Sequence, residues 1–111
     1  TTTTFINALQ EPISGFIRSG LSGRCIDVTG SPGTAEGTEV QINWCEYHIS
    51  DTDQKWQLTR EGNLINQRSG LCMDVAGEPG VDHNLKVYLK ECEYNQSLSE
   101  VNEHRWHFTN G

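Results

Sequence analysis

Residues 15–47 read GFIRSGLSGRCIDVTGSPGTAEGTEVQINWCEY, and residues 62–94 read GNLINQRSGLCMDVAGEPGVDHNLKVYLKECEY. The two stretches align without a gap at an offset of 47 residues, and 13 of the 33 positions are identical. Chance would give about two identities at this composition. A match at a fixed period is typical of a repeated structural unit, so the chain is predicted to contain two copies of one unit.

The match resumes beyond the second CEY after an insertion of three residues. Residues 53–59 (DQKWQLT) correspond to residues 103–109 (EHRWHFT) at an offset of 50. Surface loops tolerate such insertions because the entropy of loop closure grows slowly with length. The first repeat therefore covers residues 15–59 and the second covers 62–109. A tryptophan lies near the end of each repeat. These two residues, Trp56 and Trp106, are predicted to lie in the core.

The four cysteines, Cys25, Cys45, Cys72 and Cys92, are 20 residues apart within each repeat. Four cysteines allow three disulfide connectivities. Because equivalent cysteines of a repeat should pair equivalently, we predict one disulfide per unit, Cys25–Cys45 and Cys72–Cys92. Such bonds indicate an oxidising compartment, so the protein is predicted to be secreted. Structural zinc sites place cysteines two to four residues apart, and neither a metal nor a cofactor is predicted.

The residue pattern predicts an all-β fold. In the first unit, short segments rich in β-branched or aromatic residues alternate with Gly, Pro, Ser or Asp, and no helical period extends beyond two turns. The predicted strands of this unit are Ser14–Arg18, Arg24–Val28, Glu39–Trp44 and Lys55–Thr59. Strands at regular spacing without helices favour a sandwich or a barrel. Residues 1–14 lack the repeat and are interpreted as a linker or N-terminal arm.

The net charge of the chain limits the classes of ligand that it is expected to bind. The formal net charge is −7, with 8 Lys and Arg against 15 Asp and Glu. Nucleic-acid binding needs a basic surface that displaces counterions from phosphates, which this composition does not favour. An acidic membrane surface would repel the chain for the same reason, so contact with a membrane would be indirect. A neutral ligand fits the charge best.

The ordered set Gly-x-Cys-Ile-Asp-Val, Val-Gln-x-x-x-Cys and Gln-x-Trp, repeated with phased cysteines, resembles the ricin-B-type β-trefoil lectins. The resemblance implies a β-trefoil of four-strand units that binds galactose or N-acetylgalactosamine and has no catalytic activity. A complete trefoil has three units and only two are clear here, so the third is missing or degenerate. The whole chain also looks similar to the lectin module of Vibrio-type haemolysin and cytolysin pore-forming toxins.

The family pattern places a sugar site in the first unit. Sugar hydroxyls need short side chains that offer both donors and acceptors. The resemblance implies that Asp27 accepts hydrogen bonds from vicinal hydroxyls, that Asp53 binds a further hydroxyl, and that Gln41 and Gln54 orient Asp27 and the loop. Asp27 could instead simply cap a turn. The pattern also includes Asn43, which stands where the family usually has its stacking aromatic residue.

Two aromatic residues are the alternative stacking platforms. Trp44 directly precedes Cys45 and would point to the opposite face of a regular strand, where it would pack against the disulfide. A bulge could turn it towards the sugar. Tyr47 is the other candidate, although its repetition as Tyr94 also suits a structural role.

The second unit predicts a weaker site. It keeps Asp74, while the equivalents of Gln41 and Asn43 are Tyr88 and Lys90. The remaining members of this altered set are Tyr94 and His104. Since Tyr and Lys can also bind hydroxyls, the site is predicted to be changed rather than lost.

Catalysis by this chain is not predicted. The cysteines are assigned to disulfides, and no nucleophile motif, zinc-protease motif or phosphate loop is present. Asp51 and Asp53 are a conceivable carboxylate pair, but a polar loop should not raise either pKa. Two other functions stay open, a structural or oligomer-forming domain of a toxin and an accessory binding module of a glycoside hydrolase. Weak single sites would favour several copies on one assembly, and hence a homo-oligomer.

Overall fold

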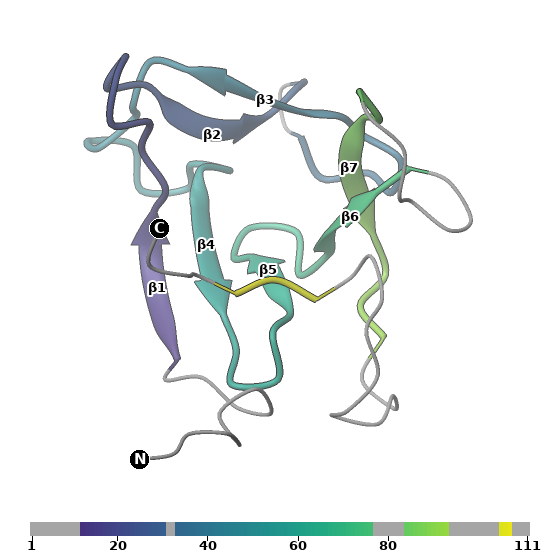
Figure 1. Ribbon diagram of the computed structural model, residues 1–111. Coiled ribbons are helices and arrows are strands. Elements are labelled where there is room, and N and C mark those ends of the chain that lie inside the picture. The colour runs from purple at the N-terminus through teal and green to yellow at the C-terminus, as the bar shows by residue number, and fades with distance from the viewer. Residues whose placement is uncertain (1–11, 31–32, 77–83, 94–104, 108–111) are drawn as a thin grey trace.

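The structure is a computed structural model that describes residues 12–30, 33–76, 84–93 and 105–107 (Figure 1). Within these ranges the chain forms strands and turns, and the described part contains no helix. The strands are β1 (Ile13–Phe16), β2 (Cys25–Val28), β3 (Val40–Asn43), β4 (Lys55–Leu58), β5 (Leu64–Asn66), β6 (Cys72–Val75) and β7 (Val87–Lys90). The predicted all-β class is confirmed. No helix among the described residues is long and apolar enough to cross a membrane.

The strands form two antiparallel sheets. One has the order β1-β4-β5-β6-β7, and the other is the β2–β3 hairpin, which lies across the top of the view in Figure 1. The strands predicted for the first unit are confirmed to within two residues at either end. β1 begins at Ile13, so the unit starts just before the predicted end of the N-terminal arm. Residues 1–11 of that arm lie outside the described residues.

The internal repeat is reproduced in the pairing of the strands. Asp27 lies opposite Gln41 in the β2–β3 hairpin, and Asp74 lies opposite Tyr88 in the β6–β7 hairpin. Every pair in one hairpin has its counterpart in the other at the offset of 47 residues. Because side chains alternate between faces with a period of two, an equal register places equivalent residues on equivalent faces. The two hairpins are therefore copies in backbone as well as in sequence.

The two tryptophans close the units in the same way. The Trp56 indole N–H donates to the Ile26 carbonyl at 3.2 Å, and the Trp106 indole N–H donates to the Met73 carbonyl at 3.0 Å. Met73 is the counterpart of Ile26. Trp56 is 1% exposed, as predicted for a core residue, and Trp106 packs against the core from its edge. A buried indole gains both apolar contact and a hydrogen bond, which explains why both units end on this residue.

The core is small, and the disulfides supplement it. Its buried apolar side chains are Val28, Trp56, Leu58, Leu64, Met73 and Leu89. The structure forms Cys25–Cys45 and Cys72–Cys92, and both predicted pairings are therefore confirmed. Cys25 and Cys72 are fully buried, so each bond ties the start of a hairpin to the segment that follows it.

Among the described residues, no strand covers one side of the sheet. The edge of Leu64–Asn66 pairs with β4, but its counterpart in the first unit, Ile17–Ser19, has no equivalent strand partner among the described residues. A 300 Å³ groove runs along this side, lined by apolar side chains that include Phe16, Trp56 and Leu64. The strand of a third unit would pack here in a complete trefoil. The described residues therefore form two units and leave the barrel unclosed.

Candidate functional site

Asp27 occupies the centre of the first unit's polar site. It lies near the end of β2 and is 5% exposed. Gln41 is its cross-strand partner on β3, and Asn43 lies two residues further along, so both side chains share its face. The Gln41 and Asn43 side-chain amides donate to Asp27 Oδ2 at 3.2 and 3.3 Å. These two donors fix the orientation of the carboxylate.

Asp53 lies directly beside Asp27. Burial raises the pKa of Asp53 to about 7, and the hydrogen bond to Asp27 and the negative charge of Asp27 add to the effect. The Gly33 backbone N–H, which donates to Asp53 Oδ2 at 3.3 Å, opposes the rise in this pKa. The prediction that a polar loop would leave Asp53 unperturbed is wrong. The loop folds inward, and the side chains of Thr52, Asp53 and Gln54 are buried.

The raised pKa of Asp53 makes stability depend on pH. Between about pH 4 and pH 7 the folded chain binds more protons at this residue than the unfolded chain, so the free energy of unfolding falls as pH rises through that window. Asp53→Asn keeps a donor towards Asp27 without the titration. At pH 8 it is expected to be more stable than the native chain by about 1–2 kcal/mol, after allowance for solvent screening, or roughly 4–15 °C in melting temperature.

Thermal unfolding of both proteins at pH 4, 6 and 8 measures this difference. The advantage of Asp53→Asn should be smallest at pH 4 and should increase towards pH 8. An advantage that is the same at all three pH values would show that Asp53 does not titrate in this window.

Gly33 allows the close approach of the chain to Asp53. A Cβ at this position would lie 2.6 Å from the Thr29 carbonyl oxygen and 2.8 Å from Asp53 Oδ2. Both distances are far below van der Waals contact, so any other residue would displace the carboxyl group. Nothing in the sequence pattern indicated this steric requirement. Gly30, three residues earlier, has a φ of 98°, a left-handed conformation that glycine adopts readily.

Gln54 fixes the segment that follows β3. It is fully buried, its side-chain amide donates to the Trp44 carbonyl at 2.8 Å, and its Oε1 accepts from the Glu46 backbone N–H at 2.8 Å. The Thr52 hydroxyl donates to the Glu46 carboxylate, which ties the same segment to the loop. Gln54 thus holds the segment at Trp44 and Glu46 in place, and it does not line the pocket.

The polar side chains enclose a pocket with a volume of 540 Å³. Its wall brings together four residues of the predicted site: Asp27, Gln41, Asn43 and Asp53. It also contains five side chains that the sequence analysis did not assign to a sugar: Glu46, Ile49, Asp51, Thr52 and Arg68. The volume lies within the range usual for small-molecule sites.

The pocket residues that were not assigned to a sugar differ in how clearly the sequence pointed to them. Glu46 belongs to the repeated CEY block, so the repeat carried a signal for it. Arg68 belongs to the second unit and forms an ion pair with Asp51 at 3.1 Å. A contact between units leaves no trace in the repeat pattern, because the alignment compares equivalent positions of the two copies and not the residues through which one copy touches the other.

Three carboxyl groups converge at the floor of the pocket. One oxygen from each of Asp27, Glu46 and Asp53 lies within 4.8 Å of the others, an arrangement that the sequence analysis did not anticipate. Carboxylate oxygens suit hard cations such as Ca²⁺. Here each group already accepts a hydrogen bond from the chain. The contact between Asp27 and Asp53 also leaves no space for a glycosidic bond between an acid and a base.

Comparison with protein families matches residues 13–111 to the ricin-type beta-trefoil lectin domain. The chain belongs to the ricin-type β-trefoil lectin family. It therefore contains a carbohydrate-binding domain, and no catalytic domain is detected in it. Comparisons with curated proteins and with solved structures gave no match. The two disulfides of the lectin are consistent with an extracellular protein.

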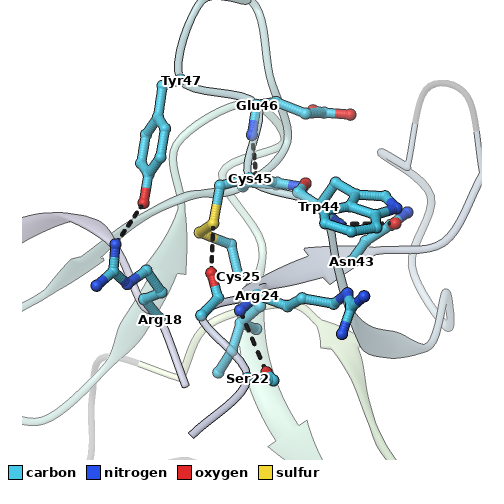
Figure 2. Close-up of a disulfide and its surroundings, with 12 residues drawn as sticks. Arg18, Ser22, Arg24, Cys25, Asn43, Trp44, Cys45, Glu46 and Tyr47 are labelled. Atoms are coloured by element: carbon cyan, nitrogen blue, oxygen red, sulfur yellow. Dashed lines mark hydrogen bonds between the residues drawn. A yellow bond between two sulfur atoms is a disulfide. The ribbon is translucent and has the colours of Figure 1, made fainter. Parts of the chain in front are cut away.

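The two aromatic candidates of the lectin lie outside the pocket wall. Figure 2 shows Trp44 and Tyr47 on opposite sides of the Cys25–Cys45 disulfide. Trp44 is 71% exposed, so the alternative that it packs in the core is wrong. Tyr47 packs edge-on against Phe16 with ring centroids 4.8 Å apart. The apolar side chain within the pocket of the lectin is Ile49.

The residues predicted for a second site are described only in part. Asp74 is 2% exposed, and its Oδ1 accepts from the Val75 backbone N–H at 2.8 Å. Tyr88 lies opposite Asp74, and Lys90 lies opposite Cys72. Tyr94 and His104 fall outside the described residues. The backbone of the first site is therefore repeated in the lectin, with different side chains around the aspartate.

Proposed function

We propose that the lectin binds a terminal galactose or N-acetylgalactosamine residue in the pocket at Asp27. The observation that carries the proposal is the buried Asp27 carboxylate, which Gln41 and Asn43 hold at the floor of the pocket. A fixed carboxylate can accept hydrogen bonds from two vicinal hydroxyls, and its charge strengthens both bonds. Asn43 adds an exposed amide at the rim.

The charge of the pocket supports a neutral sugar at this position. Glu46, Asp51 and Asp53 join Asp27 in its wall, and Arg68 is already paired with Asp51. A carboxylate or phosphate of a ligand would be repelled here. The hydroxyls of a neutral sugar instead bring donors to the carboxylate oxygens, and Ile49 offers an apolar surface to its C–H groups.

The resemblance to toxin lectin modules supports a further step in the same proposal. A secreted lectin of this kind would direct a fused pore-forming domain to glycans on a cell surface. One shallow polar pocket should bind a single sugar at about millimolar Kd, near −4 kcal/mol. Stable attachment would then need several pockets on one assembly.

A glycan array with the whole chain tests the sugar class. Terminal galactosides and N-acetylgalactosaminides should bind, in buffers with Ca²⁺ or with EDTA alike. Binding to plant or microbial polysaccharides in place of animal glycans would instead indicate an accessory module of a glycoside hydrolase. An array without any signal from folded protein would contradict the lectin proposal.

The side of the sheet that the described residues leave uncovered favours assembly as a second function. Within the chain, β4 covers one edge of β5, and the counterpart edge at Ile17–Ser19 has no such strand among the described residues. We propose that an edge strand of a second copy of this chain pairs here, and that the apolar groove lined by Phe16, Trp56 and Leu64 is buried in the dimer.

Ile13→Lys tests the dimer, because Ile13 lines the groove and is 48% exposed. The native chain should have the mass of a dimer in light scattering, and Ile13→Lys should shift it to a monomer. Ile42→Lys is the control, since Ile42 is equally exposed at 54% but lies outside the groove. A native chain that is monomeric at 100 μM, roughly the upper range for weak pairs, would contradict the proposal.

A further inference from the structure

Asn43 connects the pocket to an exposed tryptophan. Its side-chain amide donates to Asp27, and its Oδ1 accepts from the Trp44 backbone N–H at 2.8 Å. β3 ends at Asn43, so Trp44 leaves the strand at the rim of the pocket. Figure 2 shows Trp44 on the same side of the disulfide as Asn43 and Glu46, which both line the pocket. A chain of sugars that leaves the pocket past Asn43 would therefore meet this ring.

Arg24 lies against the tryptophan ring. Its guanidinium carbon is 4.2 Å from the ring centroid, and Figure 2 shows the group beneath Trp44. The ion pairs found among the described residues involve Arg68 and Lys86 rather than Arg24. A cation–π contact on an exposed ring is worth about 0.5–1 kcal/mol, enough to orient the guanidinium without neutralising its charge. Arg24 thus forms no ion pair among the described residues, and it lies near a pocket lined by carboxyl groups.

We propose that Trp44 and Arg24 form a second subsite, which binds the sugar next to the terminal residue and favours a sugar that carries a carboxylate or a sulfate. The inference rests on the proposed function of the Asp27 pocket. An exposed indole offers its open face to the C–H groups of a sugar. The guanidinium presents paired N–H donors that match the geometry of an oxyanion.

The two subsites differ in charge, and this difference determines which sugar of the ligand is neutral and which is anionic. Four carboxyl groups and one arginine line the pocket, so a negative group is disfavoured on the terminal sugar. The cation lies at Trp44, so the negative group is favoured one residue further along. The selected glycan has a neutral end and an anionic neighbour.

Titrations with four ligands test the order of charge. The ligands are methyl galactoside, a neutral galactose-terminated disaccharide, and two disaccharides with the same linkage whose second residue carries a sulfate or a carboxylate. An anionic second residue should improve the Kd of the native chain about tenfold, equivalent to 1.4 kcal/mol, and 0.5 M NaCl should remove most of that advantage. An advantage for one anion alone identifies the chemical group that is recognised.

Variants separate the two side chains. Arg24→Gln should abolish the advantage of the anionic disaccharides over the neutral one. Trp44→Ala should bring the Kd of every disaccharide close to that of the monosaccharide. Arg60→Gln is the matched control, because Arg60 lies in the exposed turn after β4 and should leave all four affinities unchanged. Circular dichroism of each variant checks its folding.

The outcomes distinguish this inference from the proposed function. If methyl galactoside binds, but the native chain does not distinguish the neutral from the anionic disaccharides, the second subsite is contradicted and the first pocket stands. If Arg24→Gln keeps the full advantage, the cation is elsewhere and the assignment is wrong. If none of the four ligands binds, both proposals fail.

Discussion

Asp27→Ala is expected to lower the affinity of the lectin for terminal galactosides by about 100-fold, which places it beyond detection on an array. The substitution removes the acceptor for two charged hydrogen bonds, each worth roughly 1.5–3 kcal/mol. It also leaves the Gln41 and Asn43 amides without their common partner, so both lose their fixed positions. Calorimetric titration with methyl galactoside at high protein concentration measures the loss.

Two further variants make this experiment specific. Asp27→Asn keeps the shape of the side chain and loses the charge. It should therefore retain part of the folding stability but little of the affinity for galactosides. Asp74→Ala removes the equivalent buried aspartate of the second unit and should cost similar stability while galactoside binding at the first pocket persists. Equal losses of binding in Asp27→Ala and Asp74→Ala would show that the affinity depends on folding alone.

Removing the first disulfide, through the double change Cys25→Ser and Cys45→Ser, is expected to lower the unfolding free energy by about 3 kcal/mol. The bond closes a loop between residues 20 apart, and its loss restores the corresponding entropy to the unfolded chain. For a small domain this corresponds to a fall in melting temperature of roughly 10–20 °C. Thermal and urea unfolding under non-reducing conditions measure both quantities.

The second disulfide provides a control within the same molecule. Cys72–Cys92 has the same separation of 20 residues, so its removal should cost a similar amount of stability. The first bond, however, joins Cys25 to Cys45, which lies between Trp44 and Glu46 beside the pocket. Only its removal should also weaken galactoside binding at temperatures where both variants are folded. Equal binding in the two double variants would argue against a role of the first bond in holding the pocket.

The part of the site that the sequence predicted is the part that a strand pairing determines. Asp27, Gln41 and Asn43 lie together because a hairpin places cross-strand and alternate residues on one face, and the repeat located that hairpin. Trp44 was harder to place, because the strand ends at Asn43 and alternation no longer applies. Its exposed position depends on Gln54, which holds the Trp44 carbonyl from another loop.

The burial of Asp53 could not be predicted from its neighbours in sequence. The loop around it is polar, and polarity usually indicates exposure. In the structure, Gly33 and Asn66 reach this loop from distant segments and satisfy it through hydrogen bonds to the Asp53 side chain and backbone. Contacts of this kind join segments that are far apart in the sequence, so neither periodicity nor composition predicts them. The same holds for Arg68, which comes from the other unit.

The matched registers of the two hairpins have a consequence for how such a protein diversifies. Both copies hold an aspartate at the same point of the same backbone, but only the surrounding side chains differ, with Gln41 and Asn43 in one and Tyr88 and Lys90 in the other. The backbone is thus the same in both copies, while the side chains around the aspartate differ. After a duplication, one copy can keep the ancestral ligand, and its twin is free to acquire a new specificity by a few point mutations, with no insertion or refolding of the scaffold.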